Sequence, residues 1–139
     1  MKFTDVGILA DDLTGACDVG ACFAQNAGRV CVIVEPNAKS LPNDMLTVIN
    51  TQTRTQDALQ SMHCIRTITK GWRQRKLIFK KIDTALRGPL GAEIQAIAET
   101  ARPRRIIVAP ACPEIGRITR NGIQLSLIHI SEPTRLRRI

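Results

Sequence analysis

Five short apolar runs, rich in β-branched residues and not alternating with polar ones, recur along the first four-fifths of the chain. Continuous apolar runs of this length are typical of strands buried on both faces of a parallel sheet. The pattern therefore restricts the chain to folds in which other elements cover both sides of a sheet. The runs are Val6–Ala10, Arg29–Val34, Leu46–Asn50, Leu77–Ile82 and Arg105–Ala109.

Three segments between these runs carry apolar residues at helical spacing. We expect Thr14 to cap the first helix and Gly28 to end it, the second helix to follow Gln56, and Pro103 to stop the third. Strands alternating with helices predict βαβ crossovers and a Rossmann-like three-layer α/β fold, with a parallel sheet between helices, present here as a partial domain. The helical faces are Ala16, Val19, Gly20, Phe23, Ala24 and Ala27; Leu59, Met62, Ile65 and Ile68; and Leu90, Ile94, Ile97, Ala98 and Ala101.

Length and composition fit one globular domain of 139 residues, 44% of them apolar. No apolar run is long enough to cross a membrane, and Asp11 and Asp12 stand where a signal peptide needs apolar residues. Five cysteines without a CxxC pair predict reduced thiols used as small apolar residues, and neither disulfides nor a zinc site. We expect a cytoplasmic protein that binds no membrane.

Polar residues follow four of the apolar runs, at the points where the strands should end. The segments are ADDLTG after the first run, NTQTR after the third, DTALRG after the fourth and PACPE after the fifth. Ligands of parallel sheets bind beyond the carboxyl ends of the strands. Carboxylates accept from sugar hydroxyls, arginine grips a carboxylate or phosphate, and the helix after Gly88 offers amide donors. The implied ligand is small, hydroxylated and anionic.

Each of these residues also has an ordinary structural interpretation. Asp12 could be only a helix cap, and Arg54 could be a solvated surface residue. Asp83 and Arg87 could form an ion pair that stabilises their loop. Lys80 and Lys81 could be plain charges at a strand end, although Lys81 lies two residues from Asp83 on the same side of an extended segment.

Several blocks of sequence together resemble one family. ADDLTGACDVG, FAQNAG, TQTR, KKIDTALRGPLGAEIQAI and IIVAPACPEIGRITRNG are similar to the N-terminal domain of the four-carbon acid sugar kinases, in the family's order. That resemblance implies a kinase that phosphorylates threonate, erythronate or 3-oxo-tetronate. It also implies that this domain holds the acid sugar, while ATP and Mg²⁺ bind mainly to a separate C-terminal domain. No P-loop occurs in the chain, which fits that division.

The resemblance assigns the site residue by residue. One departure is Ala85, where the family's DSTLRG block usually has threonine. Asp12 and Asp83 are the candidate catalytic bases, and no metal-binding residue is expected. The expected substrate contacts are Asp12, Arg54, Lys81, Asp83, Thr84, Arg87 and Gly88.

The end of the chain differs from the rest. Leu125–Arg135, LSLIHISEPTR, resembles the translated sequence of an adapter used to prepare DNA sequencing libraries. We therefore expect residues 1–124 to be the N-terminal part of the acid-sugar-binding domain and residues 125–139 to be a non-native tail. Such a fragment would have no kinase activity, because the nucleotide domain is missing.

Two other classes of protein share single features with this sequence. A net charge of +8 and a pI near 9.9 are compatible with a basic nucleic-acid-binding module. Only 3% of the residues are aromatic, too few for base-stacking platforms, so no nucleic-acid partner is expected. A haloacid-dehalogenase-type phosphatase needs a DxDx[TV] motif, whereas Asp11 and Asp12 are adjacent.

Overall fold

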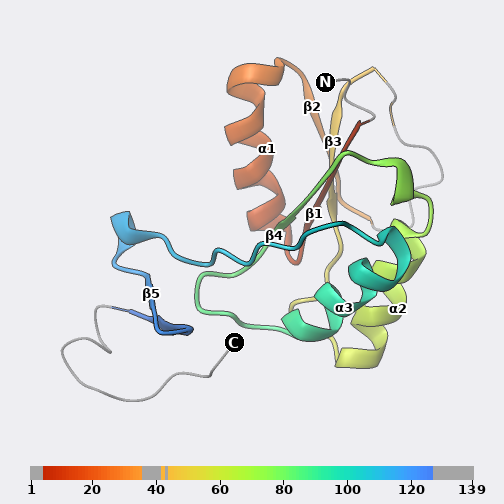
Figure 1. The fold of residues 1–139 in the computed structure, drawn as a ribbon. Helices are drawn as coiled ribbons and strands as arrows, with labels where there is room; N and C mark the ends of the chain where they lie inside the picture. Colours follow the sequence, from red (N-terminus) through yellow and green to blue (C-terminus); the bar gives the residue numbers. More distant parts are fainter. Residues whose placement is uncertain (1–4, 36–41, 43, 127–139) are drawn as a thin grey trace.

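The computed structural model describes residues 5–35, 42 and 44–126 (Figure 1). Its strands are β1 (Val6–Ala10), β2 (Val30–Ile33), β3 (Leu46–Asn50), β4 (Leu77–Lys81), β5 (Ile118–Arg120) and β6 (Ile123–Leu125). The first four form a parallel sheet in the order β2-β3-β1-β4, so β1 hydrogen-bonds to a neighbour on each side. β5 and β6 form a separate antiparallel hairpin.

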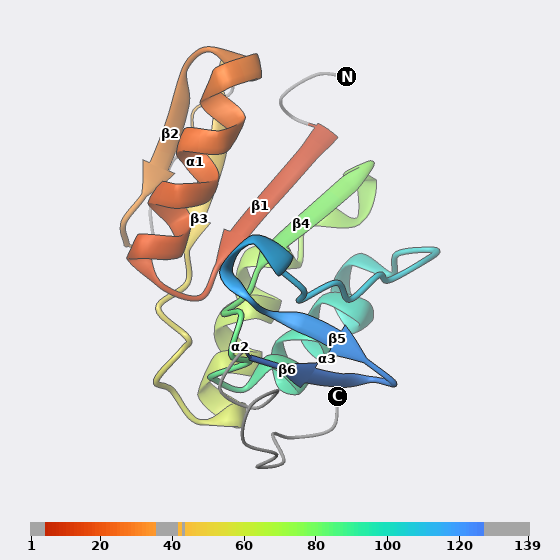
Figure 2. The ribbon, with the colours of Figure 1, turned by 90° about the vertical axis from the view of Figure 1, so that its left-hand side faces the viewer.

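Helices cover both faces of the parallel sheet (Figures 1 and 2). Helix α1 (Leu13–Ala27) lies on one face, and α2 (Ala58–Thr69) and α3 (Leu90–Ala101) pack side by side on the other. Two short 3-10 turns, η2 (Trp72–Gln74) and η3 (Pro113–Ile115), complete the elements. This arrangement confirms the three-layer α/β fold expected from the apolar runs.

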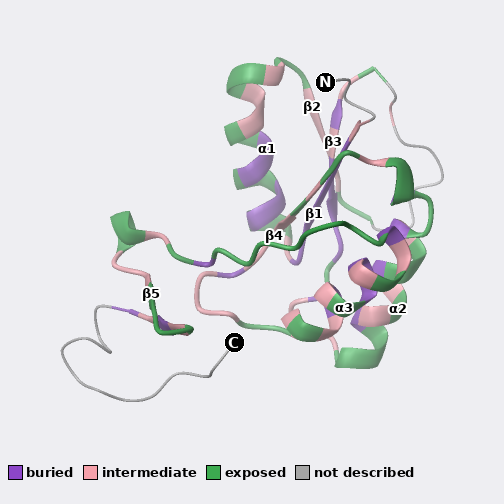
Figure 3. Ribbon diagram, viewed as in Figure 1, coloured by how far each residue is buried: buried purple, intermediate pink, exposed green. Residues whose placement is uncertain are grey.

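The core has two halves because successive residues of β1 point to opposite faces. Ile8 and Ala10 pack with Val19 of α1, whereas Leu9 packs with Ile65 of α2 in the second half. All five residues of β1 are buried, and Figure 3 shows this strand running between the two helical layers. Full burial of one such aliphatic side chain stabilises the fold by about 1.5–3 kcal/mol.

Gly7 is the one position in β1 that has no side chain to pack. A Cβ there would lie 2.4 Å from two ring carbons of Trp72, which follows α2 and is itself buried. The indole therefore occupies the place of a side chain and packs directly on the strand's backbone.

The fifth apolar run does not form the expected strand. Arg105–Ala109 has no strand assignment in the structure, and β4 remains the edge of the sheet. Ile106, Ile107 and Val108 are 47%, 79% and 40% exposed. An apolar run becomes a strand only where a neighbour supplies ladder hydrogen bonds and burial, and the described residues supply neither here.

The ends of the helices differ in one case from the expectation. Asp12, and not Thr14, caps α1, because its Oδ1 accepts a hydrogen bond from the Gly15 amide at 2.8 Å. Gly28 ends α1 with a φ of 76°, as predicted. Arg102 ends α3 in the left-handed conformation immediately before Pro103.

The described residues stop shortly after the second hairpin strand. The predicted boundary after Gln124 falls within β6, and residues 127–139 lie outside the described part of the chain, so that boundary stays a prediction. Among the described residues, no helix has both the length and the apolar content that crossing a bilayer requires.

Candidate functional site

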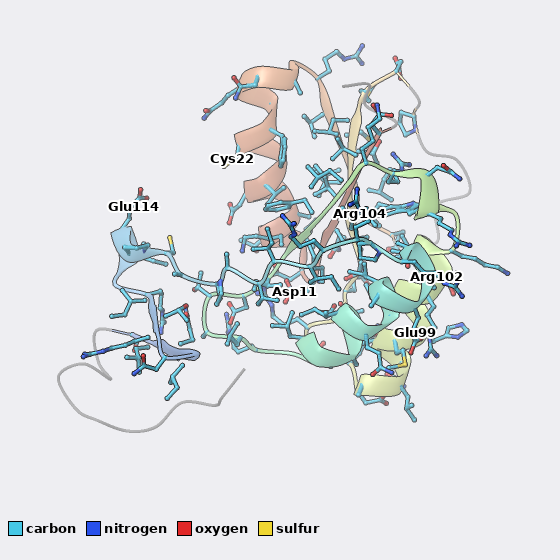
Figure 4. The ribbon with its side chains drawn as sticks, in the orientation of Figure 1. Asp11, Cys22, Glu99, Arg102, Arg104 and Glu114 are labelled. Carbon is cyan, nitrogen blue, oxygen red and sulfur yellow. The ribbon has the colours of Figure 1, made fainter. Side chains whose placement is uncertain are left out.

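Three loops meet at the carboxyl end of the sheet. They follow β1, β3 and β4, which are neighbours in the sheet, so their polar residues share one edge. We call this edge the rim, and define it as Asp11–Asp12, Thr51–Arg54 and Lys81–Gly88. Figure 4 labels Asp11, which lies near the centre of the molecule.

Arg54 joins the first two loops through a single guanidinium group. Its Nε and Nη2 donate to the two carboxylate oxygens of Asp11 at 3.0 and 2.9 Å, and its Nη1 donates to Oδ2 of Asp12 at 2.5 Å. Its backbone amide also donates to the Asp11 carbonyl at 3.1 Å. The hydrogen bonds with Asp11 raise the pKa of Arg54, against the effect of burial. Arg54 is therefore held in one orientation by two carboxylates.

Asp83 and Arg87 form a second pair at the end of β4. Nε and Nη2 of Arg87 donate to Oδ2 and Oδ1 of Asp83 at 2.8 and 2.9 Å. Oδ2 also accepts from the backbone amides of Ala85 (3.2 Å) and Arg87 (3.3 Å). Hydrogen bonding from the Arg87 side chain lowers the pKa of Asp83 to about 2, although burial acts in the opposite direction. Asp83 is thus ionised, while Arg87 keeps a largely exposed side chain.

Two glycines allow the loops to approach each other. Gly88 has a φ of 89°, and a Cβ there would lie 3.1 Å from the carbonyl oxygen of Arg54. A Cβ on Gly15 would lie 3.3 Å from Cγ of Lys81, whose ammonium donates to the Ile82 carbonyl at 2.9 Å. The first turn of α1 therefore lies beside the end of β4.

The charges of the three loops act on one another. The charge of Asp83 raises the pKa of Arg54, and the charges of Asp11 and Asp12 contribute to the raised pKa of Arg87, whose main cause is its bond to Asp83. The structure therefore brings together four charged residues separated by up to 75 positions: Asp12, Arg54, Asp83 and Arg87.

The remaining expected contacts are placed less directly. Thr84 uses its carbonyl to accept from Nε2 of Gln124 at 3.1 Å, which attaches the β5–β6 hairpin to this loop. The fourth expected loop reaches the rim only at its start, where the Pro110 carbonyl accepts from the same Gln124 Nε2 at 3.1 Å, whereas Figure 4 shows Glu114 well away from Asp11. The reason is that the run before this loop is not a strand of the sheet.

Sequence reasoning missed a buried network beneath the rim. Lys80 is not a plain edge charge: its side chain is 9% exposed, and its Nζ lies 3.0 Å from Oε1 of Glu93. Thr53 donates a short hydrogen bond to the same Glu93 oxygen. Glu93 lies three residues after Leu90 and four before Ile97, on the apolar face of α3. A charged residue at such a position is the sequence signal that could have revealed the buried network.

The rim carboxylates are occupied by arginines. In the described part of the chain, no three histidine, cysteine, aspartate or glutamate side chains are grouped to hold a metal ion. Asp11, Asp12 and Asp83 accept instead from Arg54 and Arg87. Such a donor set suits an organic anion better than a bare cation.

Comparisons with known proteins give the family of the chain. A family model described as the sugar-binding N-terminal domain matches residues 6–137. A D-threonate kinase of Salmonella typhimurium is 31% identical over 118 residues, which is 83% of this chain and 28% of that protein. A D-erythronate kinase of Heliobacterium modesticaldum is 30% identical over 128 residues, 88% of this chain and 29% of its own length.

A solved structure has the same fold. It is a protein from Bordetella bronchiseptica, described as a domain of unknown function and crystallised with citrate as a domain-swapped dimer. It is 28% identical, with a TM-score of 0.72 over 86% of this chain and 33% of the other. The chain belongs to the family of sugar-binding N-terminal domains. It spans less than one third of the length of the two kinases.

Proposed function

We propose that this chain is the acid-sugar-binding part of an ATP-dependent kinase that phosphorylates a four-carbon acid sugar. The observation that carries the proposal is the rim, where two fixed arginines and three carboxylates lie together at the carboxyl ends of β1, β3 and β4. The kinases named above act on D-threonate or D-erythronate, and the Bordetella protein holds citrate, another hydroxylated acid. The family match favours this function over nucleic-acid binding.

The rim residues supply complementary chemistry for such a ligand. Asp83 accepts from two of the five N–H donors of Arg87, which leaves other donors on an exposed side chain for the ligand's carboxylate. Further contacts to the carboxylate end of the ligand would come from Lys81 and from the backbone of Thr84 and Gly88, which precede the N-terminus of α3.

Carboxylate oxygens on the opposite side of the rim would accept from sugar hydroxyls. Of the two candidate bases, we prefer Asp12. A pKa of about 2 makes Asp83 a weak base, and its oxygens hold Arg87. Asp12 contacts Arg54 through Oδ2 and caps α1 through Oδ1, and each of these oxygens keeps a second lone pair that could accept the proton of a substrate hydroxyl.

ATP and Mg²⁺ do not fit the described residues of this chain. The rim carboxylates are bound by arginine, and the sequence has no P-loop. We therefore propose that a nucleotide-binding domain outside this chain holds both, and that the nucleotide supplies the phosphoryl group when bound. The part of this chain is to bind and orient the acid sugar.

The test uses the intact gene product in a coupled assay of ADP release with D-threonate, D-erythronate and 3-oxo-tetronate. Arg87→Ala should lower kcat/KM by about ten-fold or more, because a bidentate partner of the substrate is lost. Arg87→Lys should recover only part of this loss, since an ammonium cannot reproduce the planar fork. Arg66→Ala, an exposed arginine paired with Glu99, is the matched control. No turnover of any tetronate would refute the proposal.

A further inference from the structure

A chain of buried polar contacts lies directly beneath the rim. Lys80 contacts Glu93, Glu93 accepts from the Thr53 hydroxyl, and Thr53 Oγ1 lies 2.7 Å from Thr51 Oγ1. Thr51 Oγ1 is also 2.9 Å from the Ala10 carbonyl, and its one hydrogen can serve either acceptor. These contacts thus link four parts of the fold: β4, α3, β1 and the loop that follows β3.

Members of this network belong to the rim or directly adjoin it. Thr51 and Thr53 lie in the Thr51–Arg54 segment of the rim, and Lys80 directly precedes Lys81. Glu93 lies in the first turn of α3 and is only 2% exposed, while Thr53 is fully buried. Movement of the network would therefore move the backbone that carries the rim side chains.

Stability alone does not account for the buried ion pair between Lys80 and Glu93. Removing two charges from water costs free energy that their attraction only partly offsets, and apolar residues of similar size often stabilise as well. Among the described residues, the Lys80 ammonium has no hydrogen-bond partner of good geometry, although it lies within ion-pair distance of Glu93. What a buried charged acceptor adds is direction, because it fixes the one hydroxyl that donates to it.

We infer that Glu93 is a positioning residue for the acid-sugar site, with Lys80 as its counter-ion. Its carboxylate fixes Thr53 and so orients the Thr51–Arg54 loop, from which Arg54 reaches Asp11 and Asp12. The substrate role of that loop rests on the proposed function, whereas its positioning can be measured without substrate.

The experiment compares two double variants of the intact gene product. Lys80→Met with Glu93→Leu removes both charges and the acceptor for Thr53. Lys80→Met with Glu93→Gln removes both charges but keeps an oxygen that can accept from Thr53. Neither variant leaves a lone buried charge, so both should fold, as checked by circular dichroism.

Two readouts follow the loop. Hydrogen exchange of a peptide covering Thr51–Arg54 reports the amide bonds from Thr51 to Ala10 (2.8 Å) and from Arg54 to Asp11 (3.1 Å). With Glu93→Leu, these amides should exchange about ten-fold faster than in the wild type, and the affinity for D-threonate should fall by a similar factor. The Glu93→Gln partner should stay close to the wild type in both.

A control ion pair joins α3 to α2 at the surface. Arg66→Met with Glu99→Leu removes an exposed α2–α3 ion pair, with a distance of 2.5 Å between Nη2 and Oε2, and should leave both readouts unchanged. Thr53→Val, with the charges kept, should reproduce the loss seen with Glu93→Leu. It gives the same test if a double variant fails to fold.

Wild-type exchange and affinity in folded Lys80→Met/Glu93→Leu, or in Thr53→Val, would overturn the inference. Equal losses in both double variants would also overturn it, because the charge and not the acceptor would then matter. If the exchange results are as expected but the wild type binds no tetronate, the positioning role holds and the proposed function fails.

Discussion

Arg54 binds two neighbouring carboxylates that differ in burial. Asp11 is almost fully buried, with its side chain 4% exposed, whereas that of Asp12 is 28% exposed. Loss of the guanidinium would leave Asp11 charged, buried and without its bidentate partner. Stability and site geometry therefore depend on the same residue.

We expect Arg54→Met to lower the free energy of unfolding by about 2–3 kcal/mol, because it leaves a buried carboxylate uncompensated. Adding Asp11→Asn should recover part of this loss. Urea denaturation measures both, and Arg66→Met, at an exposed pair, should change stability by less than about 1 kcal/mol. An effect of Arg54→Met no larger than that of the control would contradict the expectation.

The Asp83–Arg87 pair gives a prediction about pH. The folded-state pKa of Asp83 is about 2, below the ordinary value of 3.8. A depressed carboxyl pKa contributes stability that is fully present above pH 4 and is lost as the pH falls towards 2. NMR titration of the Asp83 carboxyl carbon should give an inflection near pH 2, which rises towards 4 in Arg87→Met.

A control separates this pair from general charge effects. Hydrogen bonds from Gln95 and, to a smaller extent, from Arg66 lower the pKa of Glu99. Arg66→Met removes the second of these and should raise the pKa of Glu99 while leaving the pKa of Asp83 unchanged. Titration of Asp83 near pH 4 in the wild type would show that the pair does not form in solution.

At the scale of elements, the start of α3 depends on how closely one loop approaches another. Gly88 precedes the helix with a positive φ, and its α-carbon faces the backbone of Arg54. Gly91 lies within α3, and a Cβ there would meet no atom within 4 Å. The two glycines offer opposite tests in one segment.

Gly88→Ala should destabilise the protein by about 1–2 kcal/mol, since it combines an unfavourable φ with a 3.1 Å contact to backbone. Gly91→Ala should stabilise it by about 0.5–1 kcal/mol through helix propensity. Thermal unfolding of both variants gives the comparison. A shift of the same sign in both would show that the approach of the loops to each other is looser than described.

At the scale of the whole molecule, the rim is assembled by three strands, but the chain covers less than one third of the related kinases. We expect the isolated 139-residue chain to bind D-threonate or D-erythronate weakly, without any ATP-dependent phosphorylation. Calorimetry and the ADP-release assay test the two halves of this statement. Phosphoryl transfer by the isolated chain would show that it holds the nucleotide itself.

The boundary after Gln124 also belongs to this scale. We propose that residues 125–139 are a non-native tail, whose segment Leu125–Arg135 comes from an adapter, although the family match extends to residue 137. The DNA sequence around codon 125, read from an independent clone, decides whether these residues are encoded by the natural gene. A natural reading frame that encodes the same residues would refute this proposal.

The sequence predicted the elements better than it predicted their contacts. β1 to β4 lie within a residue of the apolar runs. β1 and β3 are mostly buried, as continuously apolar strands should be, whereas β2 is half-buried and the edge strand β4 leaves Leu77 and Phe79 partly exposed. The fifth run has the same composition, yet Ile107 is 79% exposed. Burial depends on a neighbour that composition does not reveal.

The rim was predicted in part for a similar reason. Residues after adjacent strands had to lie at one edge, which placed Asp12, Arg54 and Asp83. Whether Arg54 binds Asp11, Asp12 or both depends on side-chain directions that follow from packing. The pairing of Lys80 with Glu93 joins a strand to a helix and has no local sequence pattern.

The position of β1 between β3 and β4 has a consequence for folding kinetics. Ile8 pairs with Val48 and with Phe79, so both edges of this strand need partners about 40 and 70 residues away. Closing such long loops slows the search for the native state. The rim cannot exist before both pairings have formed, so its arginine–carboxylate contacts should appear late. Stopped-flow measurements of folding and unfolding should then show that Arg54→Met unfolds faster than the wild type and refolds at a nearly unchanged rate.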